Sequence, residues 1–207
     1  MVTNRREGGT PRPGLPFCCA CGSVTGELIG PGPSVGDHVV CHCTDCQAFA
    51  NRLGAGDRIL DQHAGTALYQ GRCAMMRIHT GRDRLACVHL TEKPTLRWYA
   101  QCCSTPMFNT YKNGSVPYIT TLVANCESDR RGALLGPPIG HLFTKDATGD
   151  INHLKRLSMF KLMRRFSGRL IADLLSGDRR RSPLFDRVTL DPIASPGKAD
   201  SLRPVDR

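Results

Sequence analysis

The chain has 207 residues, enough for one hydrophobic core or for one core with an appendage. Its net charge is +10, and no stretch approaches the roughly 20 apolar residues of a membrane-spanning helix, which excludes an integral membrane protein. Twenty-one glycines and fourteen prolines favour many turns and few long helices. Because the first residues contain no apolar run, we expect no secretory signal and therefore a cytoplasmic protein.

The sequence of the first 125 residues predicts a flexible tail followed by a β domain. Residues 1–16 are predicted to form the tail. Runs with alternating or β-branched residues follow at 23–29 and 38–42, and these are typical of short strands. The segment 46–53 has the apolar spacing of one or two helical turns that end at Gly54.

The second half of the β domain predicts further strands and one hairpin. The runs 74–80 and 85–92 flank the sequence GRDR, which favours a β-hairpin that turns at Gly81. Another strand, 95–100, holds the only tryptophan of the chain. Since no βαβ rhythm is present, we predict a mainly β, antiparallel domain over residues 17–125.

The character of the chain changes after this domain. Residues 126–149 are predicted to form a loop-rich connector, residues 150–178 to contain an amphipathic helix, and residues 179–207 to form a loosely ordered tail. At 100° per residue, one half of the helical wheel is apolar, and it holds Met159, Leu162, Met163, Phe166, Leu170, Ile171 and Leu174. The other half is basic and holds Lys161, Arg164, Arg165 and Arg169. The broad apolar half predicts that the helix packs on the β domain.

The positive charge is concentrated near the C-terminus. Residues 150–207 carry 13 basic and 7 acidic residues. Such a segment can bind an acidic partner, but here no aromatic residues are interleaved with the charges and no binding motif is present. We therefore interpret it as a solvated face and do not expect nucleic-acid binding.

The chain contains eleven cysteines, an odd number that cannot all pair. In a reducing compartment, clustered cysteines are more often metal ligands than disulfides. The clusters lie at 18–21, 41–46 and 102–103. Three cysteines stand alone, Cys73, Cys87 and Cys126, and we expect them to be small buried hydrophobic residues.

The segment CHCTDC places Cys41, Cys43 and Cys46 within six positions. Closely spaced thiolates are soft ligands that one short turn can present to a single ion, which predicts a zinc site. In an extended segment, Cys41 and Cys43 would share a face and His42 would point away from them. We therefore interpret His42 as a packed or supporting residue rather than as a metal ligand.

These motifs resemble those of the glutathione-dependent formaldehyde-activating enzymes, a family that shares its domain with centromere protein V. The resemblance rests on CACGSV at 19–24, VCHCTDCQAF at 40–49 and CCSTPMF at 102–108, and it covers roughly residues 17–125. It implies a β-tent, in which antiparallel sheets fold over two zinc sites. It also implies that Cys41, Cys43 and Cys46 are the ligands of a catalytic zinc.

The resemblance further implies a second, structural zinc site. Cys19, Cys21 and Cys103 match three of its ligands, whereas Ala100 occupies the position of the fourth and Ser104 replaces the usual glycine. Cys102 or Cys18 could supply the missing sulfur. We expect one zinc at the first site and allow for a second here.

The function implied by the resemblance is that of a zinc-dependent carbon–sulfur lyase. Its substrate would be a small thiol such as glutathione, or the adduct of that thiol with a small aldehyde. Arg52, Arg97 and Lys112 are candidates to bind the glutathione carboxylates, although an exposed, solvated side chain is the simpler interpretation of each. The alternative is a non-enzymatic zinc module whose basic helix binds an acidic partner. Nothing in the sequence indicates an oligomeric state.

Overall fold

The computed structural model describes residues 13–202, so most of the predicted N-terminal tail lies outside the described residues. The first strand, β1, begins at Leu15. Leu15 is fully buried, and the prediction that the tail extends to residue 16 is therefore wrong at its end.

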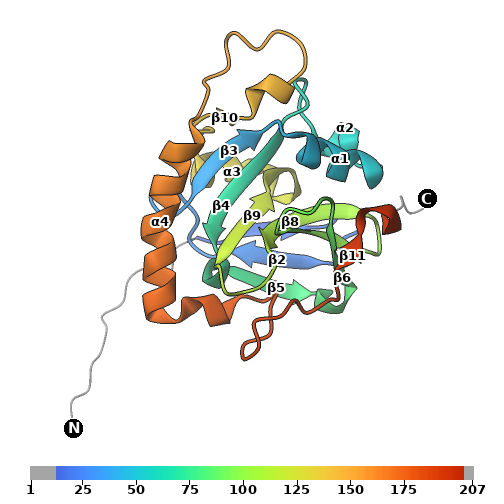
Figure 1. The fold of residues 1–207 in the computed structure, drawn as a ribbon, viewed down its shortest axis with the longest axis vertical. Coiled ribbons are helices and arrows are strands. Elements are labelled where there is room, and N and C mark those ends of the chain that lie inside the picture. The colour runs from blue at the N-terminus through green and yellow to red at the C-terminus, as the bar shows by residue number, and fades with distance from the viewer. Residues whose placement is uncertain (1–12, 203–207) are drawn as a thin grey trace.

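Two β-sheets form the centre of the molecule within residues 13–202 (Figure 1). The smaller sheet has the order β1 (Leu15–Cys18), β2 (Thr25–Leu28), β5 (Met76–Thr80). The larger sheet has the order β10 (His141–Leu142), β3 (Asp37–Cys41), β4 (Thr66–Arg72), β9 (Tyr118–Leu122), β8 (Thr105–Tyr111), β7 (Thr95–Ala100), β6 (Leu85–His89), β11 (Gly197–Lys198). The strand pairs are antiparallel except at the two borders, where β10 and β11 run parallel to their neighbours. The prediction of a β-rich fold is therefore confirmed, with the correction that the larger sheet is mixed.

The predicted hairpin around Gly81 is wrong. The two flanking strands exist, but β5 pairs with β2 in the smaller sheet, whereas β6 pairs with β7 in the larger one. Gly81 has a left-handed backbone (φ 70°), and a Cβ there would lie 2.3 Å from the carbonyl oxygen of Ser23. The glycine is therefore required at a corner where the chain passes from one sheet to the other.

The core lies between and beside the sheets. Phe17 of β1 packs edge-on against Phe108 of β8, with ring centroids 5.2 Å apart, and this contact joins the two sheets. Trp98 is fully buried and donates a hydrogen bond from Nε1 to Thr110 Oγ1 at 2.8 Å. The three isolated cysteines, Cys73, Cys87 and Cys126, are also buried, as predicted.

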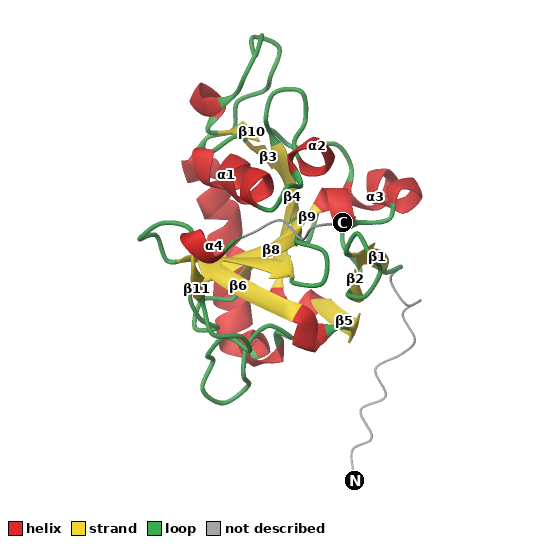
Figure 2. Cartoon of the chain, turned by 90° about the vertical axis from the view of Figure 1, so that its right-hand side faces the viewer, coloured by secondary structure: helices red, strands yellow, loops and turns green. Residues whose placement is uncertain are grey.

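Short helices cover one end of the larger sheet (Figure 2). The predicted helix after β3 is present as α1 (Thr44–Arg52), and Gly54 follows it with φ 63°. It is followed by α2 (Gly56–Ile59). The predicted connector 126–149 is more regular than expected, because it contains α3 (Ser128–Leu135) and β10.

The amphipathic helix is present as α4 (Met159–Ser176), and it lies along β3 and β4 (Figure 1). It lies within the predicted segment 150–178 and begins after Ser158, so residues 150–157 are not part of it, and Gly177 follows its end in a left-handed conformation (φ 74°). Leu162 and Phe166 are buried against the sheet, whereas Met159, Met163, Ile171 and Leu174 of the apolar half remain 41–56% exposed.

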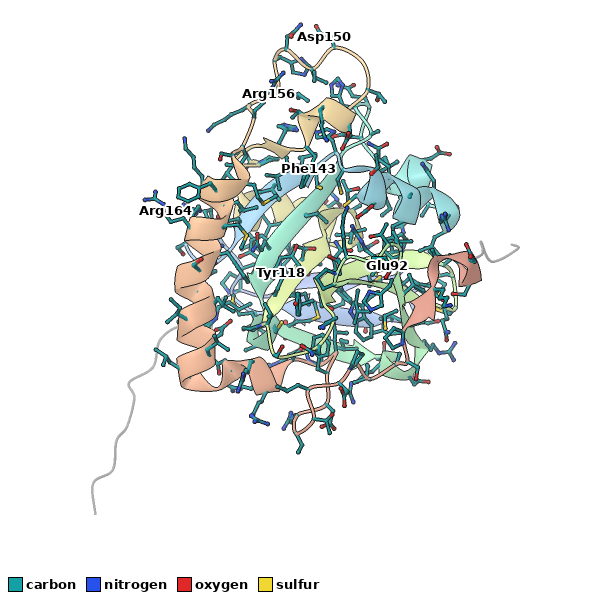
Figure 3. The ribbon with its side chains drawn as sticks, in the orientation of Figure 1. Glu92, Tyr118, Phe143, Asp150, Arg156 and Arg164 are labelled. Carbon is teal, nitrogen blue, oxygen red and sulfur yellow. The ribbon has the colours of Figure 1, made fainter. Side chains whose placement is uncertain are left out.

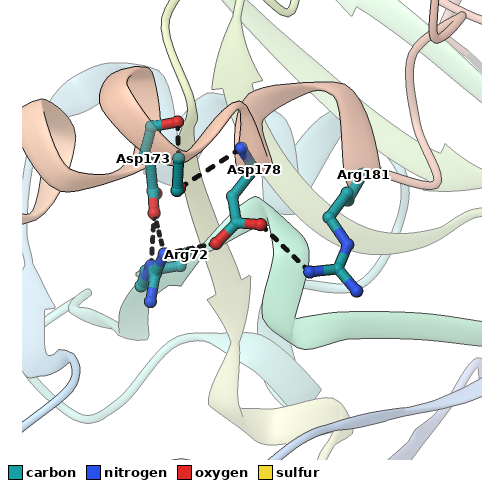
Figure 4. Close-up of polar contacts among 5 residues, drawn as sticks. Arg72, Asp173, Asp178 and Arg181 are labelled. Atoms are coloured by element: carbon teal, nitrogen blue, oxygen red, sulfur yellow. Dashed lines mark hydrogen bonds and ion pairs between the residues drawn. The ribbon is translucent and has the colours of Figure 1, made fainter. Parts of the chain in front are cut away.

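Ion pairs fix α4 to the sheet at two levels. Asp37, whose side chain is fully buried at the start of β3, accepts hydrogen bonds from Arg165 Nε at 2.6 Å and from Arg169 Nη2. Further along the helix, the buried Asp173 pairs with Arg72 of β4, which also binds Asp178 at 2.8 Å (Figure 4). Two of the basic residues predicted to face solvent, Arg165 and Arg169, are therefore bound to the protein.

The segment after Arg181 is not loosely ordered where the structure describes it. Leu184 and Phe185 are buried in the core, and Phe185 packs edge-on against Trp98. Leu202 is buried beside Phe49 and Leu53. No helix within residues 13–202 is long and apolar enough to cross a membrane.

Candidate metal centre

The three cysteines of CHCTDC converge where β3 ends and α1 begins. Cys41 is the last residue of β3, Cys43 is the N-cap of α1, and Cys46 lies in its first turn. Their sulfur atoms all lie within 4.8 Å of one another, as an ion bound to all three requires. The N-terminus of a helix favours negative charge, so this position also stabilises thiolates. The donor set suits zinc.

His42 points away from the three sulfurs, as predicted. Its ring is fully buried, with Nδ1 3.0 Å from the carbonyl oxygen of His63 and Nε2 3.0 Å from Nδ1 of His141. His42 therefore connects the end of β3 to His63 and His141. It is not placed to bind a metal held by Cys41, Cys43 and Cys46.

A buried arginine contacts one of the three cysteines and lines the same cavity. Arg97 of β7 is 6% exposed, and its Nη1 donates to Cys46 Sγ at 3.2 Å and to Asn109 Oδ1 at 3.0 Å. Asn109 in turn donates to Thr120 Oγ1 at 2.8 Å. The interpretation of Arg97 as an exposed, solvated arginine is therefore wrong, because its guanidinium faces a ligand sulfur.

The remaining candidates for carboxylate binding lie elsewhere. Arg52 donates to the carbonyl oxygen of Ala199 at 3.1 Å and lies 3.8 Å from Asp200. Lys112 is exposed and, with Arg52, lines a hollow beside β11. Neither residue lines the cavity in front of Cys41, Cys43 and Cys46.

The charges around Cys46 favour the binding of a cation by Cys41, Cys43 and Cys46. Hydrogen bonds from Cys41 and Cys43, together with the positive charge of Arg97, hold the pKa of the Cys46 thiol well below its usual range. Hydrogen bonding to Cys43 and Cys46 raises the pKa of Cys41, because its own thiolate would lie beside others. Burial alone would lower the pKa of Arg97, but the Cys46 thiolate raises it above its ordinary value. A metal ion held by the three sulfurs would supply the positive charge that three adjacent thiolates require.

A cavity of about 510 Å³ opens in front of the three cysteines. Its polar lining includes Gln70, Asn109, Tyr118 and Thr120 from three adjacent strands. Lys93 also lines it and forms an ion pair with Asp45 at 2.8 Å. The apolar lining comes largely from Val39, Leu68, Leu142, Phe143, Met159, Leu162 and Met163.

The second group of cysteines forms where the loop after β1 meets the turn between β7 and β8. The sulfurs of Cys19, Cys21, Cys102 and Cys103 all lie within 4.8 Å of one another. The Sγ–Sγ distances are 3.6 Å for Cys19–Cys21, 4.0 Å for Cys19–Cys102, 3.4 Å for Cys21–Cys102 and 3.9 Å for Cys102–Cys103. Four sulfurs at ~2.3 Å from a tetrahedral zinc would be separated by about 3.8 Å, so this group fits the ion.

The turn between β7 and β8 explains how two adjacent cysteines can face one point. Ser104 is buried and has a left-handed backbone (φ 50°), the conformation that glycine adopts most easily, so the chain bends directly after Cys103. The backbone N–H of Val24 donates to Cys19 Sγ at 3.2 Å, which stabilises a thiolate there. Cys102 therefore occupies the fourth position. Cys18 is exposed and lies outside the group.

The fold and the two groups define the class: within residues 13–202, this is a β-rich protein with two sets of cysteines that could each hold a metal ion. The chain belongs to a family of unknown function, DUF6151, which matches residues 13–195. The match spans both cysteine groups and α4, so the helix is part of the same family unit as the sites. A comparison with curated proteins gives no significant match.

Proposed function

We propose that this protein is a zinc-dependent carbon–sulfur lyase that acts on adducts of a glutathione-like thiol with a small aldehyde. The observation that carries the proposal is that Cys41, Cys43 and Cys46 offer three sulfurs at the base of a cavity of about 510 Å³. Sites with four protein ligands are mostly structural, whereas sites with three leave a position for substrate. The four-sulfur group at Cys19, Cys21, Cys102 and Cys103 would hold the structural zinc.

The resemblance to the formaldehyde-activating enzymes supports the same proposal. The order of the three cysteine motifs matches that family, and two sheets that pack on each other beside the cysteine groups are compatible with a β-tent. The observed position of Cys102 removes the main departure from the family pattern, because it replaces the ligand missing at Ala100. The β-tent and the family relationship belong to the proposal.

The reaction needs little from the protein beyond the activation of a thiol. Zinc at the three cysteines would supply Lewis acidity and would lower the pKa of a substrate thiol. In the direction of addition, the substrate sulfur forms a bond to the carbonyl carbon, the π electrons move to the oxygen, and the proton lost by the thiol ends on that oxygen. Cleavage runs these steps in reverse, so neither an oxidant nor a reductant is required.

Tyr118 is the residue best placed to interact with that oxygen. It lies in the wall of the cavity, near the centre of the larger sheet (Figure 3). Burial raises the pKa of its phenol to about 12, so the phenol stays protonated at neutral pH and can donate a hydrogen bond. We propose that Tyr118 stabilises the negative charge that develops on the oxygen during cleavage.

The alternative, a zinc module whose basic helix binds an acidic partner, has less support. Of the four basic residues on the polar face of α4, Arg165 and Arg169 are engaged by Asp37. Lys161 and Arg164 are exposed, and Arg164 points away from the sheet (Figure 3). Two solvated charges on one helix are ordinary surface, so the helix alone does not define a binding site.

The test is exchange NMR, which measures how fast glutathione and formaldehyde interconvert with their hydroxymethyl adduct. A rate is needed because the adduct also forms spontaneously, so detection of the product would not show catalysis. The zinc-loaded protein should accelerate exchange, a folded Cys43→Ser variant should not, and Tyr118→Phe should be slowed while its zinc content is unchanged. The cobalt-substituted protein should show a change in its absorption spectrum when a thiol binds. Absence of both acceleration and thiol binding would falsify the enzyme and favour the zinc module.

A further inference from the structure

The cavity in front of Cys41, Cys43 and Cys46 has two unlike walls. The polar part of the lining comes from the strands and includes the buried side chains of Gln70, Asn109 and Thr120. Helix α4, the end of β10 and the residue after it supply an apolar part of the lining, with Met159, Leu162, Met163, Leu142 and Phe143. A ligand bound at the sulfurs therefore meets both a hydrogen-bonding surface and a hydrocarbon surface.

The apolar wall is a fixed part of the molecule. Arg165 and Arg169 bind Asp37 on β3, the strand that ends at Cys41. One turn before Arg169, Phe166 packs edge-on against Tyr118 of the cavity, with ring centroids 5.6 Å apart. The position of α4 is therefore coupled to both the cysteines and the polar wall, and the family match includes this helix.

The apolar wall is also incompletely covered. Leu162 is 5% exposed, but Met159, Met163 and Phe143 remain 41%, 46% and 44% exposed. Large apolar side chains gathered at the mouth of a cavity are typical of a binding surface. Methionine is flexible and polarizable, so this wall suits apolar groups of different shapes.

The positive charges of the cavity are mostly committed to the protein. Arg97 binds Cys46, and Lys93 binds Asp45 at 2.8 Å. Among the described residues that line this cavity, Lys145 is the remaining cation that forms no ion pair. Glutathione carries two carboxylates, and a single lysine without an ion pair can neutralise only one of them.

We infer that the substrate of the three-cysteine site carries an apolar substituent, an aliphatic chain or a ring close to the reacting sulfur, that packs against Leu162, Met163 and Phe143. The inference rests on the proposed function, because it assumes that a thiol or its adduct binds at the cysteines. It keeps the reaction of that proposed function and replaces the glutathione-like thiol with a different substrate class, apolar thiols or their aldehyde adducts. The polar wall then receives the oxygen that forms at the reacting carbon.

The experiment measures the affinity of neutral thiols of increasing length for the metal-loaded protein. The probes are 2-mercaptoethanol, 4-mercaptobutanol and 6-mercaptohexanol, followed by calorimetry and by the absorption of the cobalt-substituted protein. Burial of one methylene against a half-exposed wall should tighten binding by roughly twofold, so the longest probe should bind more than tenfold more tightly than the shortest.

The variants distinguish the effect of the residues of α4 that line the cavity from the effect of the rest of the helix. Met163→Gln should flatten the dependence on chain length, and Leu162→Ala should do the same if it folds. Leu175→Gln is the matched control, because Leu175 lies on α4, is 85% exposed and does not line the cavity. It should retain the dependence seen for the wild type.

Two results would overturn the inference in different ways. Equal affinity for all three thiols in the wild type, or an unchanged dependence in Met163→Gln, removes the apolar substrate and leaves the lyase proposal intact. Binding of none of the thiols, in calorimetry and in the cobalt spectrum, removes the proposed function and the inference together.

Discussion

The two cysteine groups use the same kind of ligand in different surroundings. The group at Cys19, Cys21, Cys102 and Cys103 gathers four sulfurs from two loops, and Cys21 is exposed. The group at Cys41, Cys43 and Cys46 gathers three sulfurs from one short segment, and these sulfurs line a cavity together with Arg97, which donates to Cys46. The first ties together distant parts of the chain, whereas the second is supported by structure that would exist without it. The number of sulfurs and their separation along the sequence thus distinguish the two groups. The four-sulfur group stabilises the fold, whereas the fold positions the three-sulfur group.

The largest expected effect tests the first half of this comparison. Cys21→Ser should lower the melting temperature far more than Cys73→Ser, because a structural zinc contributes apparent folding free energies of ~10–16 kcal/mol in small zinc peptides. We expect a loss of at least several kcal/mol for Cys21→Ser. Cys73 is buried but belongs to neither group, so it is the matched control. Equal melting temperatures by calorimetry would show that the four-sulfur group does not hold the fold.

A smaller loss of stability is expected from the anchor of α4. Asp37→Asn keeps the shape of the side chain but leaves Arg165 and Arg169 without their shared carboxylate, which should cost about 3 kcal/mol because the carboxylate is fully buried and Arg169 is only 17% exposed. The control is Asp45→Asn, which breaks an ion pair to the 65%-exposed Lys93 and should cost less than about 1 kcal/mol. Urea denaturation measures both. If the two variants are equally stable, α4 is not fixed through Asp37.

A third prediction separates the two groups by metal content. The variant with Cys41, Cys43 and Cys46 all replaced by Ser should lose one zinc equivalent and keep the other, and it should melt closer to the wild type than Cys21→Ser does. The reason is that these three cysteines lie within six residues, so binding them closes only a short loop. Metal analysis and thermal unfolding of the same preparations check this. Loss of both equivalents would mean that the sites are not independent.

The smallest expected effect concerns the pH at which metal is released. Arg97 helps to hold the pKa of Cys46 below its usual range, so binding at the three-cysteine site is retained above that lowered pKa and is lost as the pH falls through it. Arg97→Met removes the charge that favours the thiolate and should move this loss to higher pH. Metal retained by the four-sulfur group provides the internal control. An unchanged release profile would show that Arg97 does not stabilise the thiolate.

The sequence was most informative where ligands lie close together along the chain. The spacing of Cys41, Cys43 and Cys46 is enough to predict that they converge, and the period-two argument also predicts that His42 points away. The choice between Cys102 and Cys18 was left open because it depends on the backbone of Ser104, which no local pattern reveals. Arg97 and Asn109 meet because they are directly opposed across β7 and β8, and that register is not visible in either strand alone.

The errors in the predicted fold have a common physical cause. The turn at Gly81 was recognised, but its two strands pair with β2 and β7, and a local turn signal carries no information about distant partners. Residues 182–202 have the composition of a loop, yet they bury Leu184, Phe185 and Leu202, and two or three apolar residues in a polar segment give no periodicity to detect. The segment predicted to contain the helix was drawn from residue 150, but the helix begins only after Ser158, where the apolar and basic periodicity begins.

The two shortest strands of the larger sheet bear on how the protein avoids self-association. β10 and β11 contribute only two residues each, and they cover the outer edges of β3 and β6. Both come from the part of the chain that follows the antiparallel region, and the open backbone of a longer edge strand would otherwise be a template for another copy of the chain. Strands this short leave little backbone for a second molecule to extend. Residues predicted to form a connector and a tail thus supply the two border strands of the larger sheet, where a longer strand would offer more open backbone for pairing.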